Sequence, residues 1–90
     1  MVESKELTIK NRLGLHARAA AMLVKTTNSF QSEVFIEKDG QRVNGKSIMG
    51  VMMLAAAKGS TIKVDVTGPD AIALLDQIES LVDDFFGEGE

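Results

Sequence analysis

The chain has 90 residues, 44% of them hydrophobic and 26% charged, and a formal net charge of −3. This length and composition are ordinary for one soluble globular domain, which we expect over residues 1–90. Without cysteine and with a single histidine, the chain lacks disulfides, thiolate chemistry and the usual zinc ligands, so we predict no metal and no cofactor. The absence of a basic cluster argues against nucleic-acid binding, and no apolar run or leader indicates membrane insertion or export, so a cytoplasmic location is expected.

The first elements are predicted from hydrophobic periodicity. Leu7 and Ile9 alternate with polar residues, which predicts a strand over residues 5–10. A loop ending at Gly14 leads into an alanine-rich helix expected from Ala17 to about Thr27. The apolar positions that share one face of this helix are Ala20, Leu23, Val24 and Thr27.

The middle of the chain predicts a hairpin and a short helix. Residues 33–38 form a strand pattern, the Asp-Gly pair at 39–40 fits a tight turn, and residues 41–44 return as a short strand. Ser47 is a favoured N-cap for the apolar run that follows over residues 48–57, and Lys58-Gly59 is a plausible helix end. A short helix that is apolar all round is either deeply buried or exposes an apolar face.

The last elements are a strand over residues 61–67 and a helix. We predict Pro69 at the first helical position and Asp70 in the first turn, with residues 87–90 as a frayed tail. The predicted buried stripe of the helix is Ile72, Leu75, Ile78, Leu81, Val82 and Phe85. This order of elements predicts an α+β fold with helices on one face of a mostly antiparallel sheet.

The only histidine, His16, stands just before the first predicted helix. Backbone N–H groups at a helix start have no intrahelical partner, and the positive end of the helix dipole favours a neutral imidazole and attracts anions. Arg18 adds donors suited to phosphate oxygens. A lone histidine in such a place is most often an N-cap or a surface residue, but this arrangement also suits phosphoryl transfer to nitrogen.

Two motifs give the chain a specific resemblance. Residues 14–18 (GLHAR) and 46–52 (KSIMGVM), followed by 57–59 (AKG), resemble the HPr family of histidine-containing phosphocarriers of the bacterial sugar phosphotransferase system. The resemblance spans essentially the whole chain. It implies an open-faced β-sandwich, with a four-stranded antiparallel sheet covered on one face by three helices in the order βαββαβα.

The resemblance also implies the chemistry. His16 would accept a phosphoryl group on Nδ1 from phosphorylated enzyme I and pass it to a histidine of enzyme IIA, with Arg18 steadying the phosphate. The protein would thus be a phosphocarrier with a covalent phosphohistidine rather than a stand-alone enzyme, and we expect a monomer. Ser47 matches a serine that HPr kinase/phosphorylase modifies in many bacteria.

A partner-binding surface is expected on the second predicted helix. By composition alone, clustered methionines are more often core residues, in which case Val51, Leu54 and Met53 would face the core. The resemblance instead favours an exposed patch that adapts to several partners. The residues we assign to this patch are Ile48, Met49 and Met52, extended by Ala21 and Val24 of the first helix.

One position departs from the family pattern, which usually has proline where this chain has Ala19. We expect phosphorylation of His16 to survive this change, because alanine is the best helix former and restores an N–H in the first turn. Other functions stay open. The chain could be an HPr-like regulator or a nitrogen-branch carrier that acts mainly through protein binding. It could also be a small ferredoxin-like ligand-binding domain in which His16 is only a cap.

Overall fold

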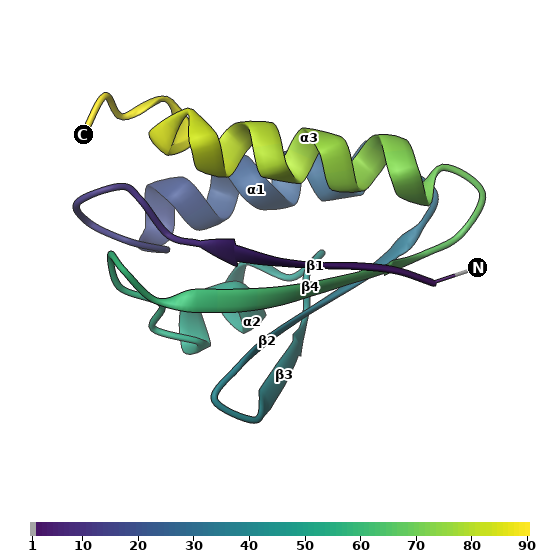
Figure 1. Cartoon of the computed structure of the whole chain (residues 1–90), viewed down its shortest axis with the longest axis horizontal. Helices are drawn as coiled ribbons and strands as arrows, with labels where there is room; N and C mark the ends of the chain where they lie inside the picture. The colour runs from purple at the N-terminus through teal and green to yellow at the C-terminus, as the bar shows by residue number, and fades with distance from the viewer. Residues whose placement is uncertain (1) are drawn as a thin grey trace.

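The computed structural model describes residues 2–90 and shows an antiparallel sheet packed against helices (Figure 1). Their sequence order is that of the predicted βαββαβα fold, with one added turn at the end. The elements are β1 (Val2–Thr8), α1 (Ala17–Asn28), β2 (Glu33–Lys38), β3 (Gln41–Asn44), α2 (Ile48–Met53), β4 (Thr61–Thr67), α3 (Ala71–Asp83) and the short 3-10 turn η1 (Phe85–Gly87).

The sheet has the strand order β1-β4-β2-β3, and every neighbouring pair is antiparallel. The predicted hairpin is confirmed, because Lys38 pairs with Gln41 across a two-residue turn. Asp39 and Gly40 both have positive φ, at 51° and 82°, as a turn that matches the twist of the strands requires. The central strands β4 and β2 therefore carry the buried alternation of the sheet, and β1 and β3 form its edges.

The core lies between the sheet and the helices. α1 and α3 run side by side over one face of the sheet, and α2 packs against α1 and β3 (Figure 1). All four residues predicted for the inner face of α1 are buried. The largest fully buried side chains come from both layers and include Leu23, Val34, Ile36, Val51, Ile62, Val64, Val66, Leu74, Ile78, Val82 and Phe86.

Two element boundaries differ from prediction. β1 begins at Val2 and ends at Thr8, rather than spanning 5–10, because its pairing with β4 extends through a polar segment that no hydrophobic alternation marks. α2 ends at Met53, before the predicted end at 58–59. The chain takes a left-handed conformation at Ala55, with φ of 49°, so that the carbonyl of Ala56 can accept a hydrogen bond from the Leu15 N–H at 2.9 Å.

The start of α3 also differs from prediction, because Pro69 and Asp70 precede the first helical residue, Ala71. The Asp70 side chain does not cap its own helix. It accepts hydrogen bonds from the backbone N–H groups of Gln31 and Ser32, both at 2.9 Å, and thereby joins the loop before β2 to the start of α3. These hydrogen bonds, with that of the Ser32 hydroxyl, lower the pKa of Asp70.

The predicted buried stripe of α3 is only partly correct. Ile72 is 60% exposed, and Leu74 is fully buried in its place. Leu75, Ile78 and Val82 are buried as expected, while Leu81 is half-buried against the core. At the end of the helix, positive φ at both Phe85 (57°) and Phe86 (50°) turns the chain, so that Phe86 rather than Phe85 fills the core.

Candidate functional site

His16 sits where the loop after β1 enters α1. Gly14 has φ of +66° and lies against the backbone at Ala56, which leaves no room for a side chain. The Leu15 N–H, next in the loop, donates to the Ala56 carbonyl at 2.9 Å. The loop is therefore attached to the segment that follows α2, and this attachment determines where the imidazole stands.

The backbone of His16 is extended, with φ of −74° and ψ of −179°, and His16 is the N-cap of α1. Its carbonyl accepts the first helical hydrogen bond, from Ala20 N at 2.8 Å. Its side chain makes no capping hydrogen bond, and the first turn holds no acidic residue. The backbone N–H groups of this turn thus remain available at the positive end of the helix dipole, as anion binding requires.

The C-terminal segment lies against His16, which shows that the prediction of a frayed tail was wrong. Nε2 of His16 is 2.5 Å from Oε2 of Glu88, and the other carboxylate oxygen of Glu88 accepts from Nδ2 of Asn11 at 2.9 Å. The Glu88 side chain is only 9% exposed. Burial opposes ionisation of this carboxyl, but the hydrogen bonds from Asn11 and His16 outweigh it, so that the pKa of Glu88 is lowered.

Basic and acidic side chains surround a cleft of about 180 Å³ beside His16. Arg18 is exposed and forms no ion pair with any other residue of the described range 2–90. Arg12 binds Glu90 through its side chain at 2.9 Å. The cleft is lined by Arg12, Leu13, His16, Arg18, Glu88 and Glu90. It therefore places one guanidinium without a carboxylate partner next to the imidazole, which suits a transient phosphoryl group.

A second cleft of about 260 Å³ begins on another side of His16 and is mostly apolar. It runs along Leu13, Leu15 and residues 55–57 to Met52 of α2. His16 thus stands between a charged cleft and an apolar one. The apolar cleft connects the histidine to the methionines of α2.

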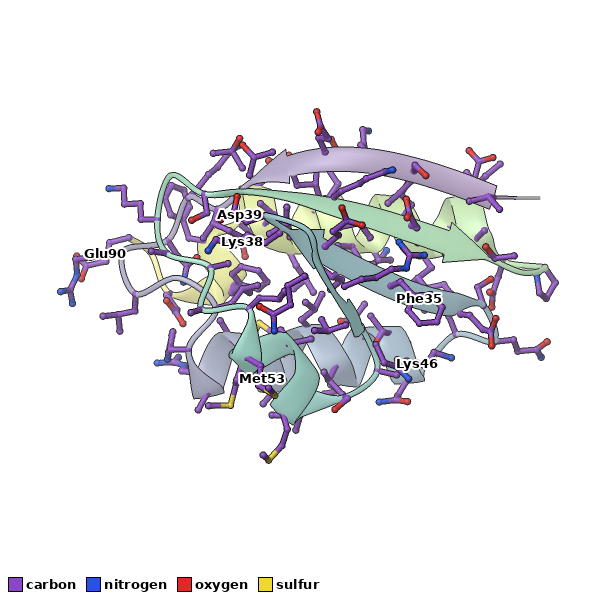
Figure 2. The ribbon with its side chains drawn as sticks, turned by 90° about the horizontal axis from the view of Figure 1, so that it is seen from below. Phe35, Lys38, Asp39, Lys46, Met53 and Glu90 are labelled. Atoms are coloured by element: carbon purple, nitrogen blue, oxygen red, sulfur yellow. The ribbon has the colours of Figure 1, made fainter. Side chains whose placement is uncertain are left out.

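The exposed face of α2 agrees with the predicted patch at three positions: Ile48 is 43% exposed, Met49 73% and Met52 41%. Figure 2 places Met53 at the end of α2 nearer to Glu90, with Lys46 on the other side. Met53 is 65% exposed, so the alternative in which it faces the core is wrong.

On α1, the exposed Ala21 is available to extend this surface. Val24 is only 7% exposed and belongs to the core, because it lies on the same helix face as Ala20 and Leu23. The prediction that Val24 contributes to an exposed patch is therefore wrong.

Ser47 is the N-cap of α2, as predicted. Its hydroxyl oxygen accepts from the Gly50 N–H at 3.0 Å, and its side chain is half-buried beside the exposed Ile48 and Met49. A phosphate on this serine would lie at the edge of the apolar patch, away from the Glu88 cleft, whose lining does not include Ser47.

Sequence reasoning missed Asn11 and Glu88. The paired phenylalanines at 85 and 86 were the signal that the tail could be anchored, since a tail with two large apolar residues just before it has a reason to stay on the core. No local pattern marks Asn11, which is fully buried and also donates to the Gly14 carbonyl at 2.8 Å. Within residues 2–90, no cluster of three or more potential metal ligands occurs, and no helix has the length and apolar character needed to cross a membrane.

Comparison with known proteins identifies the family. Residues 3–84 match the family model described as the PTS HPr component phosphorylation site. The chain is 48% identical over 86 residues to the phosphocarrier protein HPr of Neisseria meningitidis, covering 96% of this chain and 97% of the relative. It is 54% identical over 70 residues to an HPr-like protein Crh of Halalkalibacterium halodurans, covering 78% of this chain and 82% of that one.

A solved structure of HPr from Thermoanaerobacter tengcongensis superimposes with a TM-score of 0.92 at 40% identity, covering 96% of this chain and 97% of that one. The likeness to HPr in sequence and in fold therefore extends over nearly the whole chain, and it confirms the predicted open-faced sheet and its helices. This chain belongs to the HPr family, the histidine-containing phosphocarriers of the phosphotransferase system.

Proposed function

We propose that this protein carries a phosphoryl group on Nδ1 of His16, receives it from phosphorylated enzyme I and delivers it to a histidine of enzyme IIA. The observation that supports this most directly is the position of His16 at the start of α1, with Nε2 held by Glu88 and the unpaired Arg18 lining the same cleft. This leaves one ring nitrogen for chemistry beside cationic and N–H donors.

The transfer is an in-line displacement at phosphorus. The lone pair of Nδ1 forms the new N–P bond while the N–P bond to the donor histidine breaks, and the donor ring keeps the bonding electron pair. Arg18 and the free N–H groups of α1 balance the negative charge of the phosphoryl oxygens. These groups hold the phosphate without a covalent or metal bond of their own, so it remains transferable to the next histidine.

Partners dock on the apolar cleft and the exposed methionines. Ile48, Met49 and Met52 lie on α2, and Met52 lines the cleft that reaches His16. A small adaptable surface next to the reacting atom suits short-lived contacts with two different proteins. We expect the carrier itself to be a monomer, which sedimentation of the purified protein tests.

The experiment is phosphorylation by purified enzyme I and phosphoenolpyruvate, followed by intact mass measurement. The wild type should gain one acid-labile phosphate, and the His16→Ala variant should gain none. Transfer onward is tested by adding an enzyme IIA domain and following the loss of the phosphate. Absence of any incorporation with an enzyme I that is active on another carrier contradicts the carrier role.

Regulation at Ser47 is the second part of the proposal. The Ser47 hydroxyl caps α2, so a phosphate there would add a charge of about −1.5 to −2 at the helix start and stabilise the helix. The same charge would lie beside exposed apolar groups that a partner has to cover, and it would therefore weaken docking. HPr kinase/phosphorylase and ATP should add one acid-stable phosphate to the wild type and none to Ser47→Ala. A phosphorylated protein that accepts phosphate from enzyme I as fast as the unmodified one contradicts this regulatory role.

A mainly regulatory protein is the alternative, and the likeness to an HPr-like protein Crh is the observation in its favour. The two functions differ at His16, because a regulator that acts through Ser47 and the α2 surface has no need of a phosphorylatable histidine. Incorporation of an acid-labile phosphate by the wild type, absent in His16→Ala, decides for the carrier.

A further inference from the structure

We propose that Glu88 is a positioning residue for phosphoryl transfer, which holds the proton of His16 on Nε2 and keeps Nδ1 as the nucleophilic nitrogen. This inference rests on the proposed carrier function. It assigns a role to the C-terminal segment, which the motifs around His16 and Ser47 do not include.

The hydrogen-bonding pattern determines which ring nitrogen carries the proton. An ionised carboxylate can only accept hydrogen bonds, so the contact of 2.5 Å between Oε2 of Glu88 and Nε2 of His16 requires a proton on Nε2. The other oxygen, Oε1, is occupied by the Asn11 amide at 2.9 Å. In the neutral imidazole, Nδ1 then has the free lone pair.

Asn11 sets the orientation of the carboxylate. Its amide nitrogen donates both to Oε1 of Glu88 and to the carbonyl of Gly14, the latter at 2.8 Å, and its side chain is fully buried. The same amide therefore connects the tail to the loop that carries His16. The carboxylate and the imidazole are positioned by one shared residue rather than by two independent segments.

The tail is anchored on both sides of Glu88. Before it, Phe86 is 1% exposed in the core, and Gly87 N donates to the Asp84 carbonyl at 2.9 Å. After it, Arg12 N donates to the Glu90 carbonyl at 2.9 Å. Figure 2 shows Glu90 at the edge of the molecule, where this segment ends. Glu88 is thus held in place by its neighbours, as a positioning role requires.

The Glu88 carboxylate also balances the positive charge that develops on the imidazole ring during transfer. When Nδ1 forms its bond to phosphorus, the ring becomes cationic and the proton on Nε2 stays where it is. Glu88 then neutralises a charge that exists only after the N–P bond begins to form. It loses this role when that bond breaks on transfer to the next histidine, because the ring keeps the electron pair and becomes neutral again. An interaction that is stronger in the transition state than in the free carrier raises the rate of transfer in both directions.

The test compares Glu88→Ala with Glu79→Ala, a matched control that removes an α3 carboxylate ion-paired with Lys5, outside the lining of the cleft. The first readout is the tautomer of the His16 ring, measured by two-bond ¹H–¹⁵N correlation at a pH where the ring is neutral. We expect the wild type and Glu79→Ala to hold the proton on Nε2, and Glu88→Ala to populate the Nδ1-protonated form as well. Far-UV circular dichroism and urea unfolding check that both variants are folded.

The second readout is the rate of phosphorylation by enzyme I and phosphoenolpyruvate. Loss of one hydrogen bond to a charged group predicts that kcat falls about tenfold in Glu88→Ala. KM should be nearly unchanged, because the Glu88 side chain is only 9% exposed and offers a partner little surface. Glu79→Ala should stay within about twofold of the wild type. An unchanged tautomer or an unchanged kcat in a folded Glu88→Ala protein overturns this role and leaves the carrier function standing. Failure of the wild type itself to accept phosphate overturns both.

Discussion

Substitution of Gly14 by alanine should separate backbone strain from steric overlap at the base of the site. Gly14 has φ of +66°, and a Cβ added there would lie 2.3 Å from the Ala56 carbonyl oxygen and 2.9 Å from Cα of Ala57. Gly59 has φ of +88° but nothing within 4 Å of its added Cβ. The two glycines share the left-handed conformation and differ in what surrounds them, so Gly59→Ala is the matched control.

The expected magnitudes follow from these contacts. Alanine in the left-handed region costs about 1–2 kcal/mol relative to glycine, and this term applies to both variants. At Gly14, the Cβ is roughly 1 Å inside van der Waals contact with the backbone of the segment after α2, and overpacking of this kind costs about 1–3 kcal/mol more. We therefore expect Gly14→Ala to lower the free energy of unfolding by about 2–5 kcal/mol and Gly59→Ala by about 1–2 kcal/mol.

Equilibrium urea unfolding followed by far-UV circular dichroism is the appropriate assay, because the chain contains no tryptophan and no tyrosine. Gly14→Ala should also reduce phosphorylation of the folded fraction, because relief of the overlap moves the loop that carries His16. Equal destabilisation by the two variants would refute the reasoning, since it would mean that the loop and residues 56–57 separate without cost.

Three further predictions concern pH, docking and the first turn of α1. Asp65 accepts hydrogen bonds from Arg42 and Ser4, both at 2.6 Å, and these lower its pKa in the folded state below the ordinary 3.8. The stability that these hydrogen bonds contribute is therefore fully present above pH 3.8 and is lost as the pH falls through the folded-state pKa. Urea unfolding at a series of pH values should therefore show stability declining below about pH 5, and the decline should be shallower in Asp65→Asn. Met52→Glu should raise KM for phosphorylation by enzyme I about tenfold without unfolding the protein. Ile72→Glu, at an exposed apolar residue on α3, should leave KM unchanged, and equal effects of the two variants would contradict docking on α2. Ala19→Pro should keep the phosphorylation rate within about twofold of the wild type, because the first helical hydrogen bond is donated by Ala20 and the Ala19 N–H has no helical acceptor. Abolished transfer would show that the Ala19 N–H is needed at the site.

The sequence predicted well those elements whose local pattern and tertiary role agree. Residues 33–38, 41–44 and 61–67 were predicted as strands at the observed bounds, because alternation on a half-buried sheet is a strong signal and the Asp-Gly turn fixes the hairpin. α1 was predicted to within a residue for a similar reason, since its inner face is purely apolar or small. At these places, short-range chemistry and the final packing favour the same conformation.

Predictions failed where a distant segment determines the local conformation. α2 ends at Met53 although the following alanines favour helix, because the Ala56 carbonyl is needed by Leu15 across the site. Asp70 serves the loop before β2 instead of its own helix, which no spacing within 68–72 could indicate. The tail was predicted to be frayed because terminal residues are ordered only where other parts of the chain hold them. Its anchoring depends on Phe86, Asn11 and Arg12.

The same contrast explains how the site is built. His16 and Arg18 lie two residues apart in sequence and could be paired by motif alone. The groups that hold the imidazole and its loop come from the loop after β1, the segment after α2 and the C-terminal segment. A phosphocarrier has to hand its phosphoryl group on, so it cannot bury the reacting nitrogen, and the side chain of His16 is 29% exposed. The contacts that the structure shows lie at Nε2 of the ring and between the loop and residue 56, and we propose that they set the tautomer and orientation of the imidazole. The cleft lined by Arg18 and the apolar cleft both open beside His16. Under the proposed function, each partner would complete the charge balance around the phosphate only while it is bound.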